Sequence, residues 1–457
     1  MGIRAFTLLL LTAGFATVAA YSPADSSALA MLREIAEKVH ANSQGMPNYT
    51  CTQNILRIHY AQRANVRAQS CAAMAQDHSP GVKLYQDRLR LDVAVVDNLE
   101  TFAWAGAKAF ETTEISTLIE GTSGSGDFGS FLSAAFGGGV GKYVYKGEAD
   151  LDIGFLAKFL YEIPVEKSRY RLRIGKGYAT IGYRGAFYAD PKEADVRRLE
   201  IEAEDFPAAA GVCRVRDTMD YRRIKMGDHD FLLPEETSME VLYTSGATSL
   251  NKTVYTGCKQ YVGESTIRFD DPEEEKTSAE EKRDAQIPLP LKTKIQVALS
   301  APVDLYRASA GDAVTALVTK DVVKDKKVLV KANSKLNGRL VRLEQDFPGP
   351  MPHWVVGIKF ESIERAGIEQ SIKLEPTDDG FRSKLPSTYA RVRDQIAALP
   401  RHKKGAGMGL FIFATSENPK LDQNFRSEWQ ISELAPPVVV PAAPAKAAPP
   451  TPATPKP

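Results

Sequence analysis

The chain has 457 residues, more than one ordinary domain needs, and its 43% hydrophobic and 25% charged residues are typical of globular proteins. This composition excludes a wholly disordered, a collagenous and a multi-spanning membrane protein. Lys and Arg total 58 against 57 for Asp and Glu, which leaves a net charge of +1. Such a balance gives no indication of binding to nucleic acid or to an anionic surface.

Residues 1–20 have the pattern of a secretory signal peptide. Arg4 provides the positive start, Phe6–Val18 is an apolar stretch, and Ala19 and Ala20 are the small residues that signal peptidase requires before Tyr21. An uncleaved membrane anchor is the alternative, but the apolar run is short for a hydrocarbon core about 30 Å thick. We therefore expect a periplasmic or secreted protein with no transmembrane segment after signal removal.

Four cysteines would then lie in an oxidising compartment, where they are candidates for disulfide bonds: Cys51, Cys71, Cys213 and Cys258. Four cysteines allow three pairings, and short loops favour Cys51–Cys71 together with Cys213–Cys258. A metal site is the alternative, but the sequence lacks the C-x-x-C and H-x-x-x-H spacings that metal sites favour. We expect neither a metal nor a cofactor.

A leading amphipathic helix is predicted to begin at Ser22-Pro23 and to end at Gly45 and Pro47. Its apolar side chains recur at three- and four-residue spacing, at Leu29, Leu32, Ile35, Ala36 and Val39.

Strands with period-two alternation follow the helix. Leu89, Leu91, Val93 and Val95 alternate with charged residues and Ala94, and the same pattern recurs near residues 169–174, 199–204, 239–243 and 267–269. Alternation with a charged outer face is typical of an antiparallel sheet that has one dry and one wet face. Helices are also predicted at Phe128–Phe136 and at Leu151–Leu160.

Composition divides the chain into five segments. Residues 272–286 hold nine charged residues in fifteen, which is typical of a solvated linker, and residues 435–457 hold nine of the 27 prolines, which is typical of a disordered tail. The expected segments are a signal peptide (1–20), a half-barrel domain (21–271), the linker (272–286), a β-barrel or sandwich domain (287–434) and the tail (435–457). The expected fold class is mainly β with a few helices, namely a curved antiparallel sheet with a helical lid and then a second, smaller β domain.

No motif predicts catalysis. The glycine-rich run Gly121–Gly129 lacks the Lys-Ser/Thr of a phosphate-binding loop, and Ser125 stands where a nucleophile elbow needs its last Gly. We interpret the run as a turn that caps the helix at Phe128–Phe136. The six histidines are scattered and follow no recognisable nucleophile motif. We expect a non-catalytic protein.

The signal peptide, the leading helix and the long one-sided sheet resemble the periplasmic lipoprotein-carrier class, which includes the lipoprotein-sorting proteins. This resemblance covers about Tyr21–Asp271 and implies a half-open barrel in which a helical lid shelters a cavity for acyl chains. Shorter phrases resemble exported proteins of unassigned function from acidobacterial soil bacteria, namely Pro47–Cys51, Thr122–Phe128, Phe231–Pro234 and Gly263–Ser265.

Residues 291–344 resemble the β-barrel module at the C-terminus of conjugative type IV secretion channel proteins. The matching phrases are Leu291–Leu299, Gly311–Val318 and Lys331–Gly338. The last usually contains Pro-Lys-Gly-Ser, and here Ala332-Asn333 replaces the middle of that phrase. The resemblance implies the fold and not the pore, because the membrane-crossing segments of those channels are missing. Trp429 is expected in the core of this domain.

Two functions are compatible with these features. One is an exported envelope protein that shelters a lipid or an acylated protein in the half-barrel, lined by Leu29, Leu32, Ile35 and Val39 on the lid and by Leu89, Leu91 and Val93 beneath. The alternative to a cavity is that these side chains simply pack together into a dry core. The other function is an envelope scaffold that uses the second β domain and the tail to hold unidentified partners, and a hydrolase assembled from scattered residues is a third option.

Overall fold

The computed structural model describes residues 23–433 except 63–69, 77–80, 98, 108, 111, 129, 138–140, 176, 262–282, 284, 348–351, 378–407, 415–418 and 424. The predicted signal peptide (1–20), most of the predicted linker (272–286) and the predicted tail (435–457) lie outside these residues. No helix in the described part is long and apolar enough to cross a membrane.

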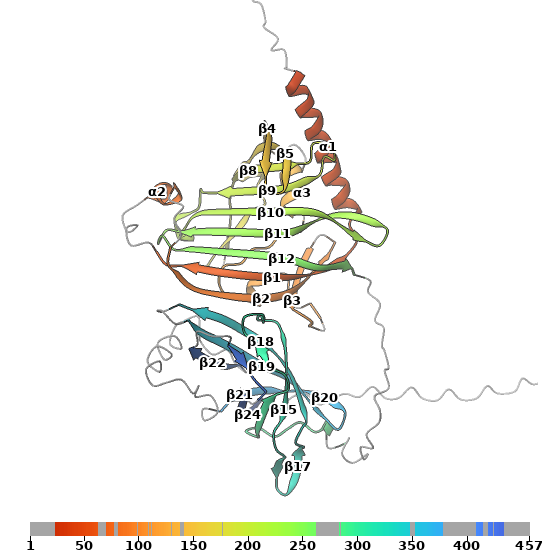
Figure 1. Cartoon of the computed structure of the whole chain (residues 1–457), viewed down its shortest axis with the longest axis vertical. Helices are drawn as coiled ribbons and strands as arrows, with labels where there is room; N and C mark the ends of the chain where they lie inside the picture. The colour runs from red at the N-terminus through yellow and green to blue at the C-terminus, as the bar shows by residue number, and fades with distance from the viewer. Residues whose placement is uncertain are drawn as a thin grey trace, which may run out of the picture.

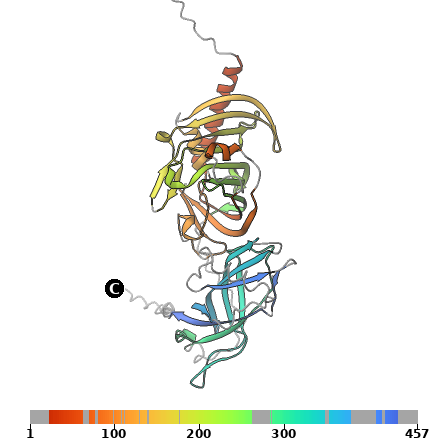
Figure 2. The ribbon, with the colours of Figure 1, turned by 90° about the vertical axis from the view of Figure 1, so that its left-hand side faces the viewer.

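The expected fold class is confirmed: the protein is mainly β and is built on a large antiparallel sheet. We call the elements from α1 to β12 the N-terminal unit and those from β13 to β24 the C-terminal unit. The two units follow one another along the long axis of the molecule (Figures 1 and 2).

The N-terminal unit is one curved sheet with strand order β4-β5-β8-β9-β10-β11-β12-β1-β2-β3. Its sheet strands are β1 (Tyr49–Tyr60), β2 (Lys83–Val96), β3 (Leu99–Trp104), β4 (Lys142–Leu151), β5 (Gly154–Ile163), β8 (Tyr183–Ala189), β9 (Val196–Ala203), β10 (Val212–Met226), β11 (His229–Tyr243) and β12 (Thr248–Gln260). A separate hairpin is formed by β6 (Arg171–Ile174) and β7 (Gly177–Thr180). The helical elements are α1 (Pro23–Gly45), α2 (Cys71–Gln76), α3 (Ser130–Phe136) and the short turns at Ile115–Thr117, Val165–Lys167 and Ala208–Ala210.

The predicted leading helix is confirmed as α1, and the helix predicted at Phe128–Phe136 is confirmed as the shorter α3. The helix predicted at Leu151–Leu160 is wrong, because Leu151 ends β4, residues 152–153 form a turn and residues 154–160 belong to β5. In β5 the side chains at alternate positions point into the core, at Ala157, Phe159, Tyr161 and Ile163. The apolar run is therefore read with period two rather than with the helical period.

The C-terminal unit continues the same hydrogen-bonded sheet. Its strands are β13 (Lys294–Leu299), β14 (Val303–Asp304), β15 (Ala313–Val318), β16 (Val322–Lys324), β17 (Lys327–Val330), β18 (Lys335–Asp346), β19 (His353–Arg365), β20 (Ile368–Ser371), β21 (Lys373–Pro376), β22 (Gly409–Ala414), β23 (Lys420–Leu421) and β24 (Arg426–Glu433). The predicted core residue Trp429 is fully buried and packs edge-on against Phe360 at 5.0 Å between ring centroids. This unit has its own hydrophobic cluster, separate from those of the N-terminal unit.

Strand β2 joins the two units. It pairs with β1 along its length, with β3 over Leu91–Val96 and with β18 over Tyr85–Asp87. A second contact lies beside it, where Ala310 exchanges backbone hydrogen bonds with Arg88 and Arg90 at 2.8 and 2.6 Å. The units therefore share backbone hydrogen bonds and do not merely touch through side chains.

Candidate functional site: a covered polar band on the inner sheet face

A row of buried polar side chains crosses the inner face of the N-terminal sheet. Strand register places Asp87 of β2 opposite Arg57 of β1, Arg57 opposite Asn251 of β12, and Asn251 opposite Met239 of β11, which faces Asp217 of β10. The four polar members are each at most 9% exposed. We call this row the polar band. Buried polar groups need partners, because leaving them unpaired costs about 1–3 kcal/mol each.

The glycine-rich segment 121–128 lies over the polar band and supplies partners to Arg57 and Asn251. Arg57 donates to Asp87 and to the carbonyl oxygens of Glu120 and Thr122, and Asn251 Nδ2 donates to the same Thr122 oxygen at 2.9 Å. The segment is therefore more than the turn predicted from the sequence, because its Thr122 oxygen also accepts hydrogen bonds from side chains of β1 and β12. Glycine suits this path: Gly121 and Gly126 have φ of 87° and 107°, in the left-handed region.

Two carboxyl groups fix the far end of the segment. Glu100 of β3 accepts hydrogen bonds from the backbone N–H groups of Gly126, at 2.9 Å to Oε2, and of Phe128, at 3.3 Å to Oε1. Asp127 Oδ2 accepts from the hydroxyls of Thr237, at 3.1 Å, and of Tyr255. The segment thus presents both acceptors and donors to the sheet.

Burial shifts the acid–base behaviour of these carboxyls. Desolvation and the charge of Asp127 raise the pKa of Glu100 to about 7, and desolvation also raises the pKa of Asp127 itself. Desolvation and the same Asp127 charge raise the pKa of Asp217, in the polar band, to about 8. Three acids with raised pKa values are therefore gathered at one glycine-rich segment, Asp127 within it and Glu100 and Asp217 on the sheet.

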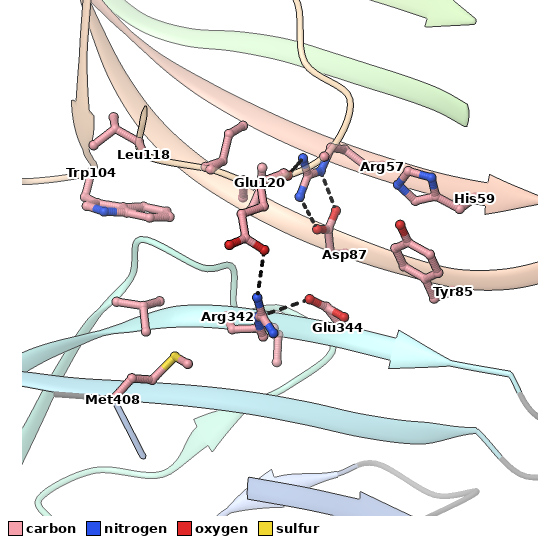
Figure 3. A pocket seen from close by; sticks show the side chains of 15 residues that line it. Arg57, His59, Tyr85, Asp87, Trp104, Leu118, Glu120, Arg342, Glu344 and Met408 are labelled. Carbon is pink, nitrogen blue, oxygen red and sulfur yellow. Dashed lines mark hydrogen bonds and ion pairs between the residues drawn. The ribbon is translucent and has the colours of Figure 1, made fainter. Parts of the chain in front are cut away.

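A hollow of about 190 Å³ opens where the segment meets the C-terminal unit (Figure 3). Arg57, Asp87 and Tyr85 line it from the N-terminal unit, and Arg342 and Glu344 of β18 line it from the other side. Glu120, at the start of the segment, reaches across and pairs with Arg342 at 3.6 Å. The hollow is smaller than the roughly 300–1,000 Å³ of ordinary ligand pockets. A ligand of lipid size would need more room than this hollow provides.

The structure places the sequence-predicted lining residues in two different clusters. On α1, Ile35 and Val39 are buried against β8–β10, Leu32 packs at the margin of that cluster, and Leu29 is 42% exposed. On β2, Leu89, Leu91 and Val93 are buried in a second cluster with Ile115, Ile119 and Phe128. The α1 residues therefore lie in one cluster and the β2 residues in another. Helix α1 does not cover the β2 residues, which lie under residues 115–128.

The cysteines form two disulfides, and the pairing favoured by loop length is wrong. Cys51 of β1 is bonded to Cys258 of β12, and Cys71 of α2 is bonded to Cys213 of β10. Strands β1 and β12 are neighbours in the sheet although they are about 200 residues apart in sequence. Loop length does not predict the pairing here, because β1, the first strand of the N-terminal unit, pairs with β12, its last strand.

One serine and one histidine lie in hydrogen-bond contact within this region. Ser249 Oγ is 2.7 Å from His59 Nδ1, on directly opposed positions of β12 and β1. Ser249 is only 1% exposed and also contacts the hydroxyls of Thr122 and Tyr243. With segment 121–128 in place the hydroxyl has no open approach for a substrate. In the described part of the chain no group of His, Cys, Asp and Glu has metal-binding geometry.

Sequence reasoning missed the polar band and the two anchoring carboxyls. On β12 the inward positions are Ser249, Asn251, Thr253 and Tyr255, whereas Val254 points outward and is 42% exposed. Polar residues thus occupy the inward positions of β12, whereas apolar residues occupy the corresponding inward positions of β2. The one available signal was the glycine-rich run itself, whose length and polarity exceed what a helix cap requires.

No protein-family model matches the chain, and no curated protein matches it. Three solved structures are similar to parts of it. ComB10 of the Com type IV secretion system of Helicobacter pylori is 13% identical over 32% of this chain and 88% of its own, with a TM-score of 0.19. A putative outer membrane lipoprotein-sorting protein domain from Vibrio parahaemolyticus is 10% identical over 51% and 93%, with a TM-score of 0.25.

The third, a DUF1329 family protein from Desulfovibrio piger, is 11% identical over 51% of this chain and 95% of its own, with a TM-score of 0.23. These identities and TM-scores are too low to carry an argument about this chain.

Proposed function

We propose that the chain is an exported, non-catalytic envelope protein whose N-terminal unit shelters an apolar ligand, a lipid or acyl chain, against the inner face of the curved sheet. The observation that carries this proposal is the nature of the cover. The inner face is covered by separate pieces, the helices α1 and α3 and residues 115–128, rather than by a second sheet. Separate pieces are displaced more easily than a paired sheet, because few backbone hydrogen bonds join them to the strands.

The disulfides agree with the proposed export. Cys51–Cys258 and Cys71–Cys213 account for all four cysteines. Disulfides persist in secreted and periplasmic proteins and are rare in the reducing cytosol.

The lining of the proposed site follows from the two clusters. We place the apolar ligand over Leu89, Leu91 and Val93 of β2, with Ile35 and Val39 of α1 at the other end of the face. These residues are buried against the cover and would contact the ligand once the cover moves. Leu32 would contact it from the edge of α1, and Leu29 would close over it from the solvent side.

The test is native mass spectrometry of the protein purified gently from its own envelope, compared with a denatured sample. An excess mass that is lost on denaturation supports the shelter. In parallel, the delipidated protein is titrated with a fluorescent fatty acid. Uptake of no apolar probe, combined with a clean apo mass, would refute the proposal.

A matched pair of variants locates the ligand. Val93→Thr puts a hydroxyl on the inner face and should weaken uptake roughly tenfold, because burying an unpaired hydroxyl costs about 1–3 kcal/mol. Val82→Thr makes the same chemical change at a side chain that is 74% exposed and should leave uptake unchanged. Equal effects would place the probe elsewhere.

A scaffold that holds envelope partners is the second candidate, and the joint between the units favours it. β18 pairs with β2, and Arg90 of β2 forms an ion pair with Asp312 beside β15. These contacts fix the orientation of one unit against the other, as a two-sided scaffold requires. A pull-down with and without residues 435–457 tests the part played by the tail, since unchanged partners would exclude it.

A further inference from the structure

Segment 121–128 supplies hydrogen-bond acceptors to the side chains of the sheet, as a bound ligand would. The carboxyl of Asp127 accepts hydrogen bonds from the hydroxyls of Thr237 and Tyr255, on adjacent strands β11 and β12. These two hydroxyl donors converge on one oxygen, Asp127 Oδ2. The sheet therefore holds two converging donors, and the acceptor between them belongs to the cover and not to the sheet.

An apolar group directly follows this acceptor. The Phe128 ring is 6% exposed and packs edge-on against Tyr49 at 5.8 Å and Tyr255 at 4.7 Å between ring centroids. It belongs to the same hydrophobic cluster as Leu91 and Val93. The segment therefore presents a carboxyl followed by an apolar ring to the sheet. The ring of Phe128 lies at the inner face of β2.

The segment is a poor filler for that space. Apart from Phe128 the segment is composed of Gly, Ser, Thr and Asp, so it buries little apolar surface besides that one ring, and hydrophobic stabilisation is about 25 cal/mol per Å² of such surface. Its Asp127 carboxyl is also kept from water, which favours a neutral over a charged group. Moving the segment out returns that carboxyl to solvent, and an apolar chain in its place would bury more apolar area.

We propose that segment 121–128 is a built-in occupant of the ligand site, and that the ligand is a long-chain carboxylic acid whose carboxyl replaces that of Asp127 between Thr237 and Tyr255. The inference rests on the proposed shelter and names its ligand class. The alkyl chain takes the place of Phe128 and runs over β2. Because one carboxyl replaces another, the number of acidic groups beside Glu100 does not change.

The first experiment compares two probes on the full-length oxidised protein. Palmitic acid and hexadecanol share the alkyl chain and differ at the head group. Palmitic acid should bind about tenfold more tightly, because its carboxyl accepts from both Thr237 and Tyr255 and each such hydrogen bond contributes about 0.5–1.5 kcal/mol. Palmitic acid should also speed hydrogen exchange at the amides of residues 121–128, because the bound acid displaces them.

Three variants separate the occupant from its site. Asp127→Ala weakens the closed segment without touching the ligand's donors, so palmitic acid should bind severalfold more tightly. Asp228→Ala, at an exposed acid in the β10–β11 turn, is the matched control and should change nothing. Tyr255→Phe removes one donor and should weaken palmitic acid about fivefold while leaving hexadecanol unchanged. If Tyr255→Phe fails to fold, Thr237→Val tests the other donor with the same expectation.

The outcomes distinguish the two proposals. If neither probe binds to any variant, the shelter itself is wrong. If both probes bind equally, and Asp127→Ala leaves their affinities and the exchange of residues 121–128 unchanged, the shelter stands and the inference about its ligand and its occupant is overturned.

Discussion

The carboxyl of Asp127 lies close enough to that of Glu100 for its charge to act on it, and desolvation together with this charge raises the pKa of Glu100 to about 7. Tyr221 of β10 and Tyr255 of β12 interact with both acids, and Tyr49 of β1 interacts with Glu100. Each of these phenols has a raised pKa, for which desolvation is the largest cause. Hydrogen bonds to these two carboxyls therefore hold the cover of the polar band together with apolar packing.

We expect stability to fall as the pH rises from about 4 to about 8, and to level off above the folded pKa values of Glu100 and Asp217. The raised pKa values of Glu100 and Asp217 mean that the folded protein binds more protons than the unfolded chain, whose carboxyls titrate near 4. This contribution is fully present below the unfolded pKa and is lost above the folded pKa. For Glu100 it amounts to at most about 3 kcal/mol. Thermal unfolding from pH 5 to 9 measures it.

Glu100→Gln should flatten that pH dependence, because an amide does not titrate. Glu162→Gln, at an exposed position of β5, should leave it as in the parent. A Glu100→Gln profile that coincides with the parent profile would show that Glu100 does not titrate in this range.

Reduction of the disulfides should destabilise the N-terminal unit. Replacing a native disulfide pair typically costs about 2–5 kcal/mol, so Cys51→Ala with Cys258→Ala should lower Tm clearly. Peptide mapping without reductant should recover Cys51 linked to Cys258 and Cys71 linked to Cys213. Recovery of Cys51 linked to Cys71 would contradict the strand order of the sheet.

Gly311→Ala should loosen the joint between the units. Gly311 has φ of 108°, and a Cβ there would lie 2.0 Å from the carbonyl oxygen of Arg90. We expect a loss of more than about 2 kcal/mol, from strain and overlap together, and faster hydrogen exchange at Arg90 and Ala310. Gly367→Ala, with φ of 75° and nothing near the new Cβ, should cost only about 1 kcal/mol.

Arg90→Ala tests the charged part of the same joint. Arg90 pairs with Asp312 and also donates to Asn54 Oδ1 at 2.9 Å, so the variant removes both contacts. We expect about 1 kcal/mol of destabilisation and a more extended particle in solution scattering. Arg216→Ala removes a comparable pair with Glu202 on the outside of the N-terminal sheet, and its scattering curve should match that of the parent.

Local patterns were enough to predict the leading helix, the strand at Leu89–Val95 and the burial of Trp429. In each of these segments the spacing of apolar side chains matches the period of the element that forms. The β-rich fold class follows from the same alternation repeated along the chain. For Leu151–Leu160 the run is apolar at both periods, and only its pairing with β8 selects the strand.

Tertiary structure alone decided the disulfide pairing, the joint and the site. Cys51 meets Cys258 because β1 and β12 are adjacent in the sheet, a neighbourhood that depends on long-range hydrogen bonding and leaves no trace in loop length. Asp127, Thr237 and Tyr255 are each unremarkable in their own segments. They form a site because the curvature of one sheet brings β11, β12 and a distant glycine-rich segment to the same point. Burial at that point raises the pKa of the Asp127 carboxyl.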